Sequence, residues 1–233
     1  MKKSRRWFAV YPLTILAFLA CVRWGSHAVS TFSENAPISR NSCILIDAGH
    51  GGVDGGASSV AGIPESRYNL EISLRLEDLF HLLGYETAMI RREDVSIYTK
   101  GETIAQKKIS DLKERVRIAN ERPNCLLLSI HQNHFPDPRY SGAQVFYPKT
   151  QGSKELAARL QTALCTTLDP SNHRQAKQSS GVYLMDRITC TGVLIECGFL
   201  SNPAEEAKLR SAGYQQKLCA VIATTVGSFL SNT

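Results

Sequence analysis

Residues 43–52 read Cys-Ile-Leu-Ile-Asp-Ala-Gly-His-Gly-Gly, a short apolar run that gives way to acidic, imidazole and glycine residues. This order predicts a buried β-strand followed by a polar, glycine-rich loop. The loop extends to residue 66, and from Arg67 the apolar side chains recur at helical spacing until Gly84. A strand, a loop and a helix in this order indicate the beginning of an α/β domain.

The pattern of an apolar run followed by a polar side chain recurs twice further along the chain. Leu126–Ile130 is followed by His131, and Val193–Ile195 is followed by Glu196. In α/β sheets, ligands bind beyond the carboxyl ends of the strands. We therefore expect the polar residues after the three strands to converge on one site: Asp47, His50, His131 and Glu196.

The rest of residues 41–233 alternates apolar runs with amphipathic helices. The patterns predict further strands at 85–90, 143–147 and 182–185, and further helices at 111–121, 153–168 and 214–230. Residues 91–106 are polar and support no prediction. The alternation indicates a single α/β domain with a mostly parallel sheet flanked by helices.

The residue types expected at the site match a metal-dependent hydrolase. Two neutral imidazoles and one carboxylate bind Zn²⁺ and leave a fourth position for water, so His50 and His131 are candidate ligands. Glu65 and Asp54 are the acids of the loop after His50, and their spacing alone does not choose between them. A further carboxylate is needed as a general base. Glu196 fits this role, because its apolar neighbours predict a pKa raised by desolvation.

Three blocks of the chain resemble the signature sequences of the zinc-dependent N-acetylmuramoyl-L-alanine amidases of the amidase-3 family. The blocks are Ile46–Gly52, Ser129–Asn133 and Ile195–Asn202, in the order typical of that family. The resemblance covers about residues 43–230, and three ordered blocks are far more specific than any one of them. It implies a domain with a twisted six-stranded sheet flanked by helices.

The resemblance also implies a ligand set and a reaction. Zinc is expected on His50, Glu65 and His131, with water as the fourth ligand, and Glu196 is expected to be the catalytic acid and base. The expected reaction is hydrolysis of the amide between N-acetylmuramic acid and L-alanine in peptidoglycan. One departure concerns Glu65: members of the family usually carry a lysine soon after this glutamate, whereas Ser66–Arg67 follows it here.

Within the family, the layout is most similar to the CwlD-type amidases of spore-forming bacteria. That similarity implies a role in spore-cortex maturation ahead of muramic-δ-lactam formation and, as in some of those enzymes, a lipoprotein partner. Cell-separation or autolytic wall amidases are the alternative. The cell-separation enzymes typically carry an inserted autoinhibitory helix, for which only the short polar stretch 93–106 leaves room.

Two other classes of protein make different predictions. A non-catalytic wall-binding protein of this fold would be expected to lack a zinc ligand or Glu196, and all of these residues are present. A thiol hydrolase would use Cys197, but no histidine is paired with it locally.

Residues 1–24 carry a signature of export. Basic residues at positions 2, 3, 5 and 6 precede an apolar run from Trp7 to Val22, and such a positive flank stays inside the cell. We expect a retained signal-anchor, with a cleaved signal peptide as the alternative. Residues 25–40 are expected to form a linker and residues 41–233 the catalytic domain, placed outside the cytoplasm and, under the cortex role, in the forespore intermembrane space.

The net charge of +6 is concentrated at the N-terminus. Residues 1–40 hold six basic residues and one acid, so residues 41–233 carry a net charge of only +1. A nearly neutral domain lacks the basic surface on which nucleic-acid binding depends, and we expect no such partner.

Overall fold

The computed structural model describes residues 43–122 and 124–232. The predicted signal segment at 1–24 and the linker at 25–40 lie outside the described residues. No helix in the described ranges is both long and apolar enough to cross a membrane. In chain order, the described helices and strands are β1 (Cys43–Ala48), α2 (Glu65–Leu82), β2 (Glu86–Met89), α3 (Ile104–Asn120), β3 (Cys125–Asn133), β4 (Gln144–Tyr147), α4 (Ser153–Leu168), β5 (Lys177–Gln178), β6 (Gly192–Phe199), α5 (Pro203–Leu209) and α6 (Ala212–Leu230).

The six strands form one sheet in the order β2-β1-β3-β6-β4-β5. Every neighbouring pair is parallel except β4 and β6, which are antiparallel. This confirms the predicted six-stranded, mostly parallel sheet. The three strands that end in candidate site residues, β1, β3 and β6, are adjacent at its centre, where parallel strands are buried on both faces and so need continuous apolar runs.

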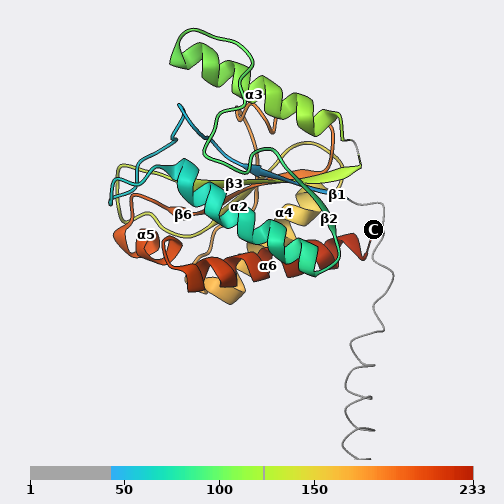
Figure 1. The fold of residues 1–233 in the computed structure, drawn as a ribbon. Coiled ribbons are helices and arrows are strands. Elements are labelled where there is room, and N and C mark those ends of the chain that lie inside the picture. The colour runs from blue at the N-terminus through green and yellow to red at the C-terminus, as the bar shows by residue number, and fades with distance from the viewer. Residues whose placement is uncertain (1–42, 123, 233) are drawn as a thin grey trace, which may run out of the picture. The chain divides into compact units, whose positions relative to one another are not determined.

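Helices cover both faces of the sheet (Figure 1). Helices α2, α4, α5 and α6 lie on one face, and α3 lies on the other together with the segment after β5. On the α3 side, Leu45, Leu127 and Leu194 of the sheet pack in one apolar cluster with Leu184 and Ile188 of that segment.

The predicted strand at 182–185 is wrong. These residues form a turn, in which Asp186 N–H donates to the Val182 carbonyl at 2.9 Å and Ile188 N–H donates to the Leu184 carbonyl at 3.1 Å. Leu184 and Met185 are apolar because they fill the core above the sheet, not because they pair with a strand.

Helix α3 begins at Ile104, seven residues before the predicted start at 111. Thr103 and Gln106 form a capping box, in which each side chain accepts a hydrogen bond from the other residue's backbone N–H. The first half of α3 exposes Ile104 and Ile109 instead of burying an apolar face, so hydrophobic periodicity did not reveal it.

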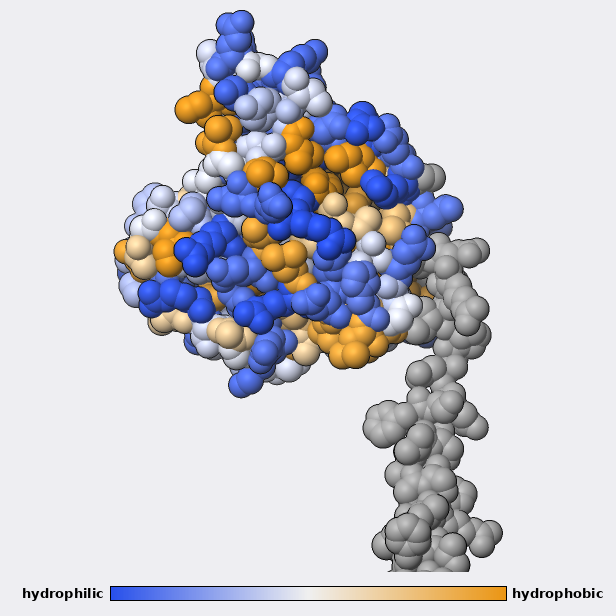
Figure 2. Space-filling model, viewed as in Figure 1, coloured by the Kyte–Doolittle hydropathy of each residue, from blue (hydrophilic) through white to orange (hydrophobic). Residues whose placement is uncertain are grey.

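On the face shown in Figure 2, hydrophilic side chains predominate and hydrophobic ones form separate patches.

Candidate metal centre

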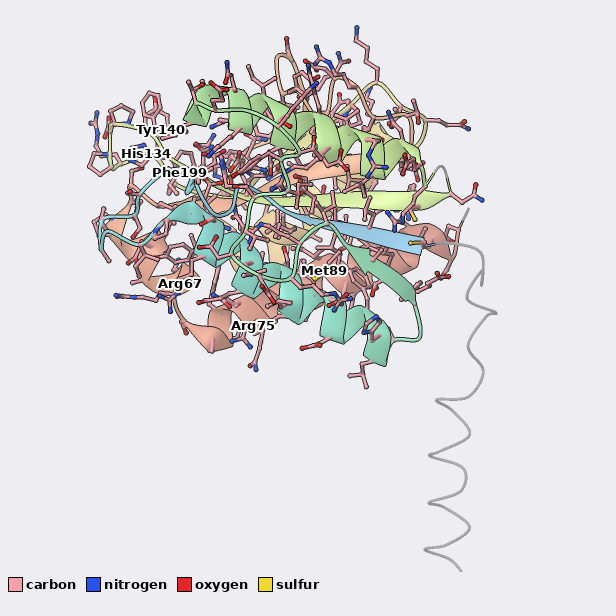
Figure 3. All side chains as sticks on the ribbon, turned by 45° about the horizontal axis from the view of Figure 1, so that its top comes forward. Arg67, Arg75, Met89, His134, Tyr140 and Phe199 are labelled. Atoms are coloured by element: carbon pink, nitrogen blue, oxygen red, sulfur yellow. The ribbon has the colours of Figure 1, made fainter. Side chains whose placement is uncertain are left out.

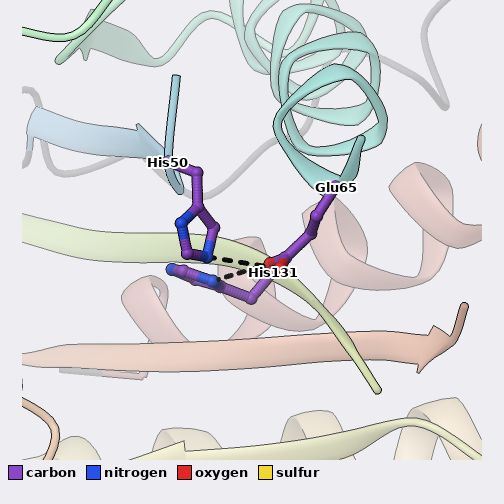
Figure 4. Close-up of side chains that lie close together, drawn as sticks. All are labelled: His50, Glu65 and His131. Atoms are coloured by element: carbon purple, nitrogen blue, oxygen red, sulfur yellow. Dashed lines mark hydrogen bonds and ion pairs between the residues drawn. The ribbon is translucent and has the colours of Figure 1, made fainter. Parts of the chain in front are cut away.

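Three of the predicted site residues meet near the carboxyl ends of β1 and β3 (Figure 4). His50 lies just after β1, Glu65 is the first residue of α2, and His131 lies within β3. Glu65 Oε1 is 3.0 Å from His131 Nδ1, and Glu65 Oε2 is 3.3 Å from His50 Nε2. One ligand atom from each residue lies within 4.8 Å of the other two, which is compatible with a shared metal ion.

The backbone around His50 is shaped to bring the two imidazoles together. A Cβ atom on Gly49 would lie 2.3 Å from the His131 ring, so only glycine fits there. His50 itself has φ of 59°, in the left-handed region that a side chain rarely adopts. Such backbone strain is typical of functional sites, where the surrounding structure holds it in place.

Of the two acids in the loop, Glu65 is the one whose carboxylate lies against both imidazoles, as the resemblance to the family implies. Burial opposes its ionisation, but hydrogen bonds from His131 and His50 outweigh burial and hold the pKa of Glu65 well below its usual range. The N-terminus of α2 adds a positive dipole end at the same place. The Ala57 and Gln132 backbone N–H groups also donate to this carboxylate, each at 3.1 Å.

Asp54, the other acid of the loop, lies on the far side of the His50 ring. Its Oδ2 atom is 2.9 Å from His50 Nδ1, and Lys108 Nζ on α3 is 3.2 Å from the same oxygen. A carboxylate on the second nitrogen of a metal-binding imidazole fixes the tautomer and the ring orientation. Despite the burial of His50, its hydrogen bonds with Asp54 and Glu65 raise the pKa of His50 to about 9 in the absence of metal.

Glu196 occupies the adjacent strand, directly opposite His131 in the register of β3 and β6. Its Oε2 atom is buried and makes no hydrogen bond within the described part of the chain. Burial raises the pKa of Glu196 to about 7, which confirms the direction predicted from its apolar neighbours. Cys197 is 1% exposed, and burial raises the pKa of its thiol well above the usual value, so it is a poor nucleophile.

Comparisons with known proteins match this arrangement to one family. The model of the amidase-3 family, described as N-acetylmuramoyl-L-alanine amidase, matches residues 44–228. The chain belongs to the N-acetylmuramoyl-L-alanine amidases of this family.

Three known relatives resemble this amidase over most of its length. The germination-specific N-acetylmuramoyl-L-alanine amidase of Bacillus subtilis is 35% identical over 226 residues, which cover 95% of this chain and 93% of the relative. The structure of the CwlD amidase from Clostridioides difficile in complex with the GerS lipoprotein is 38% identical, with a TM-score of 0.79, and the match covers 83% of this chain and 100% of that one. A second solved amidase from Clostridium difficile 630 has 28% identity and a TM-score of 0.71, over 82% of this chain and 98% of that one.

Asp47 of the amidase does not join the metal group, although it was expected at the same site. It is 1% exposed, accepts a hydrogen bond from Ser129 Oγ at 2.7 Å and forms an ion pair with Arg115 of α3. Arg115 also donates to the carbonyls of Ala48 at 3.0 Å and His50 at 2.7 Å. Asp47 therefore supports the His50 loop from beneath, through a buried arginine.

Arg91 is a supporting residue of the amidase that the sequence patterns did not single out. It is 3% exposed, and its guanidinium donates to the carbonyls of Ala48 at 2.8 Å and of Gly49, Ser66 and Glu93 at 2.9 Å. These bonds tie the end of β1 to the start of α2, where two of the candidate ligands lie. The only sequence signal for Arg91 is its position just beyond a predicted strand end.

Proposed function

We propose that this amidase is a zinc hydrolase in which His50, Glu65 and His131 hold the metal and Glu196 is the acid and base. The observation that supports it is the convergence of two imidazoles and an ionised carboxylate beside a buried carboxylate oxygen without a partner. The proposed reaction cuts the amide between the lactyl group of N-acetylmuramic acid and the first L-alanine of the peptidoglycan stem peptide.

The donor set fits Zn²⁺ better than a hard cation. Two imidazole nitrogens and one carboxylate are a ligand set of catalytic zinc, whereas calcium and magnesium prefer oxygen donors alone. When bound, Zn²⁺ polarises carbonyl groups and lowers the pKa of water, so that hydrolysis proceeds near neutral pH. His50 and His131 must both be neutral to bind it, and each ring nitrogen that now faces Glu65 is the candidate donor atom.

Glu196 supplies the proton transfers of the proposed reaction. Its carboxylate accepts a proton from the attacking water and returns that proton to the nitrogen of L-alanine as the amide bond breaks. A pKa near 7 suits both transfers, since a general acid and base acts best when its pKa is close to the working pH. Asp54 and Arg91 hold the His50 loop in place during the reaction.

Incubation of the full-length protein, kept in detergent with zinc, on purified peptidoglycan tests the proposal. We expect mass spectrometry to detect released peptides that begin with L-alanine. Glu196→Gln is expected to reduce release at least about 100-fold while zinc binding is retained. Cys197→Ala is the matched control next to it and is expected to keep the rate. Undiminished release by Glu196→Gln would contradict the assigned role.

The biological role that we propose is maturation of the spore cortex. The support comes from two of the relatives above, one named germination-specific and the other a CwlD amidase solved with a lipoprotein. We propose a lipoprotein partner for this chain on the same ground. Inactivation of the chain in its own host should leave a cortex without muramic-δ-lactam, and a normal lactam content would point to the cell-separation alternative.

We further propose that the catalytic domain, residues 41–233, acts outside the cytoplasm and is anchored by residues 1–24 through the linker 25–40. The basic flank and the apolar run of the N-terminal sequence support this location, as does a wall substrate. The family match from residue 44 agrees with the proposed start of the domain. Release of the protein into the medium after signal cleavage is the alternative, and fractionation of cells distinguishes the two.

A further inference from the structure

Three aromatic residues form a ledge near the carboxyl edge of the sheet, on the strand that carries Glu196 and the loop after β3. Two of them, Tyr140 and Phe199, are labelled in Figure 3. The ledge consists of Phe135 and Tyr140 in the loop after β3 and Phe199 at the end of β6. The Phe135 and Tyr140 rings are 4.4 Å apart between centroids, and the Tyr140 and Phe199 rings are 6.3 Å apart.

The two outer rings of the ledge are open to solvent. Phe135 is 44% exposed and Tyr140 is 45% exposed, whereas Phe199 is only 3% exposed and supports Tyr140 from below. Among the large hydrophobic side chains that are exposed in residues 43–122 and 124–232, these two are the only aromatic ones. Two aromatic rings that are left exposed, in contact with each other and beside a catalytic centre, indicate a binding surface.

The register of the sheet turns the ledge toward the catalytic side. Residues three positions apart in a regular strand point to opposite faces. Here, however, Glu196 is opposite His131 and Phe199 is opposite Asn133, so β6 contains one extra residue between the two pairs. Opposed residues share a face of the sheet, so this β-bulge places Phe199 on the same face as Glu196.

Hydrogen bonds hold the loop of the ledge in one conformation. The Asn202 amide donates to the carbonyls of Pro138 at 2.9 Å and Tyr140 at 3.3 Å. Phe135 N–H donates to Ser201 Oγ at 3.1 Å. A surface fixed before the ligand arrives loses little conformational entropy on binding.

Arg174 completes the ledge with a polar edge. Its guanidinium lies 5.0 Å above the centre of the Phe199 ring, and its Nε atom donates to the Ser141 carbonyl at 2.9 Å. A sugar ring has an apolar flat face of C–H groups, which is attracted to the negative face of an aromatic ring, and a rim of hydroxyl groups, which accept hydrogen bonds from a guanidinium. The ledge therefore matches a sugar in both its apolar and its polar parts.

We infer that the ledge binds the sugar of the glycan strand that neighbours the N-acetylmuramic acid being cleaved. The inference rests on the proposed function, since it extends the substrate outward from Glu196. Phe199 is three residues from Glu196, a separation of about 10 Å along a strand, and the centre of the Tyr140 ring is 6.3 Å from that of Phe199. The ledge is thus separated from the reacting amide and reaches a neighbouring sugar of the glycan strand. We therefore expect the ledge to make the enzyme prefer polymeric substrate over a single muramoyl-peptide.

The test compares the activity of the full-length protein on two substrates. One substrate is intact glycan strands that carry stem peptides, and the other is a single N-acetylmuramoyl-peptide without neighbouring sugars. Tyr140→Ala is expected to raise KM about tenfold on the strands and to leave both KM and kcat on the small substrate unchanged. Tyr140→Trp, which retains a ring, is expected to keep the wild-type KM. Leu82→Ala is the matched control, because it removes an 82% exposed apolar side chain at the other end of the 18-residue helix α2.

Binding of peptide-free glycan strands, measured by calorimetry, separates the two proposals. Strands that bind to the wild type, and at least about fivefold more weakly to Tyr140→Ala, support the ledge even if no peptide is ever released, in which case only the proposed function fails. An unchanged KM on strands, or equal losses on both substrates, would overturn the inference while the amidase reaction stands. Weakened association with a lipoprotein partner, without a change in KM, would likewise overturn it and assign the ledge to a protein.

Discussion

At the scale of the residue, the most informative atom is Glu196 Oε2. Buried carboxylate oxygens are nearly always hydrogen-bonded, because an unpaired one costs on the order of 1–3 kcal/mol. This oxygen is buried and has no partner within the described residues, at a position opposite His131. We attribute this loss of stability to the proposed function, since an unpaired carboxylate with a raised pKa is ready to take a proton from the attacking water.

The pH dependence of the reaction follows from the same residue. The proposed base, Glu196, must be ionised to act, and burial raises the pKa of Glu196 to about 7. We expect kcat/KM to be constant above this pH and to fall about tenfold per pH unit below it. A pH–rate profile on a soluble muramoyl-peptide measures this, with circular dichroism at each pH to show that the fold persists. A profile without an acid limb between pH 5 and 8 would contradict the assignment.

A second prediction at this scale concerns Asp54, which holds the far nitrogen of His50. Asp54→Asn removes the negative charge that fixes the imidazole, and we expect zinc affinity to fall about 10- to 100-fold. Competition with a chromophoric chelator measures the affinity. Asp94→Asn is the control, because Asp94 accepts a hydrogen bond from Gly52 in the same loop but does not touch His50. Equal losses in both variants would show that the loop, and not the His50 contact, matters.

At the scale of the element, α3 is attached to the domain through charge more than through apolar packing. Its buried residues are Ser110, Asp111, Arg115 and Ala119. Arg115 pairs with both Asp111 and Asp47 and is 2% exposed. Burial opposes the ionisation of Asp47, but the charges of Arg115 and His131, together with hydrogen bonds from Ser129 and Arg115, outweigh burial and lower the pKa of Asp47. One buried arginine therefore links the helix to the strand that leads to His50.

This attachment predicts an unequal effect of two arginines on the same helix. Arg115→Ala leaves two buried carboxylates without their partner, and we expect it to lower the free energy of unfolding by about 3 kcal/mol or more. Arg117→Ala removes exposed ion pairs with Glu114 and Glu121 and is expected to change stability little. Urea denaturation measures both variants. Similar stabilities would mean that the Asp47–Arg115 pair does not hold the helix.

At the scale of the whole molecule, the proposed metal joins parts of the chain that are far apart in sequence. Its candidate ligands come from the loop after β1, the start of α2 and the end of β3, and Glu196 comes from β6. A ligand that binds only the folded protein stabilises it in proportion to the logarithm of its concentration.

Removal of the metal is therefore expected to lower the melting temperature of the full-length protein. At a free zinc concentration of about 1,000 times Kd, binding stabilises the folded protein by about 4 kcal/mol. For a domain of this size, that corresponds to a rise in melting temperature of roughly 10 °C. Differential scanning fluorimetry with zinc and with a chelator measures the shift. Glu196→Gln is expected to keep the shift and His131→Ala to lose it. A shift that survives in His131→Ala would place the metal elsewhere.

Sequence patterns predicted best where burial and local chemistry coincide. The strands that contain Ile44–Ile46, Leu126–Ile130 and Val193–Ile195 were all found, because a central parallel strand must be apolar throughout. Sequence patterns failed at 182–185, where apolar residues pack in a turn, and at 104–110, where a helix exposes its apolar residues. In both places the tertiary surroundings, and not the local periodicity, determine the structure.

The sequence by itself determined the family, the mostly parallel sheet and the pairing of His50 with His131, because each of these depends on local runs of residues and on the order of three blocks. The resemblance to the family also named Glu65 as a ligand, but only the tertiary structure shows its carboxylate against both imidazoles. Only the tertiary structure decided that Asp47 pairs with Arg115 instead of joining the ligands, and that Phe135, Tyr140 and Phe199 form a ledge. The physical reason is distance along the chain. Contacts between residues tens of positions apart depend on how strands and helices pack, which no local pattern records.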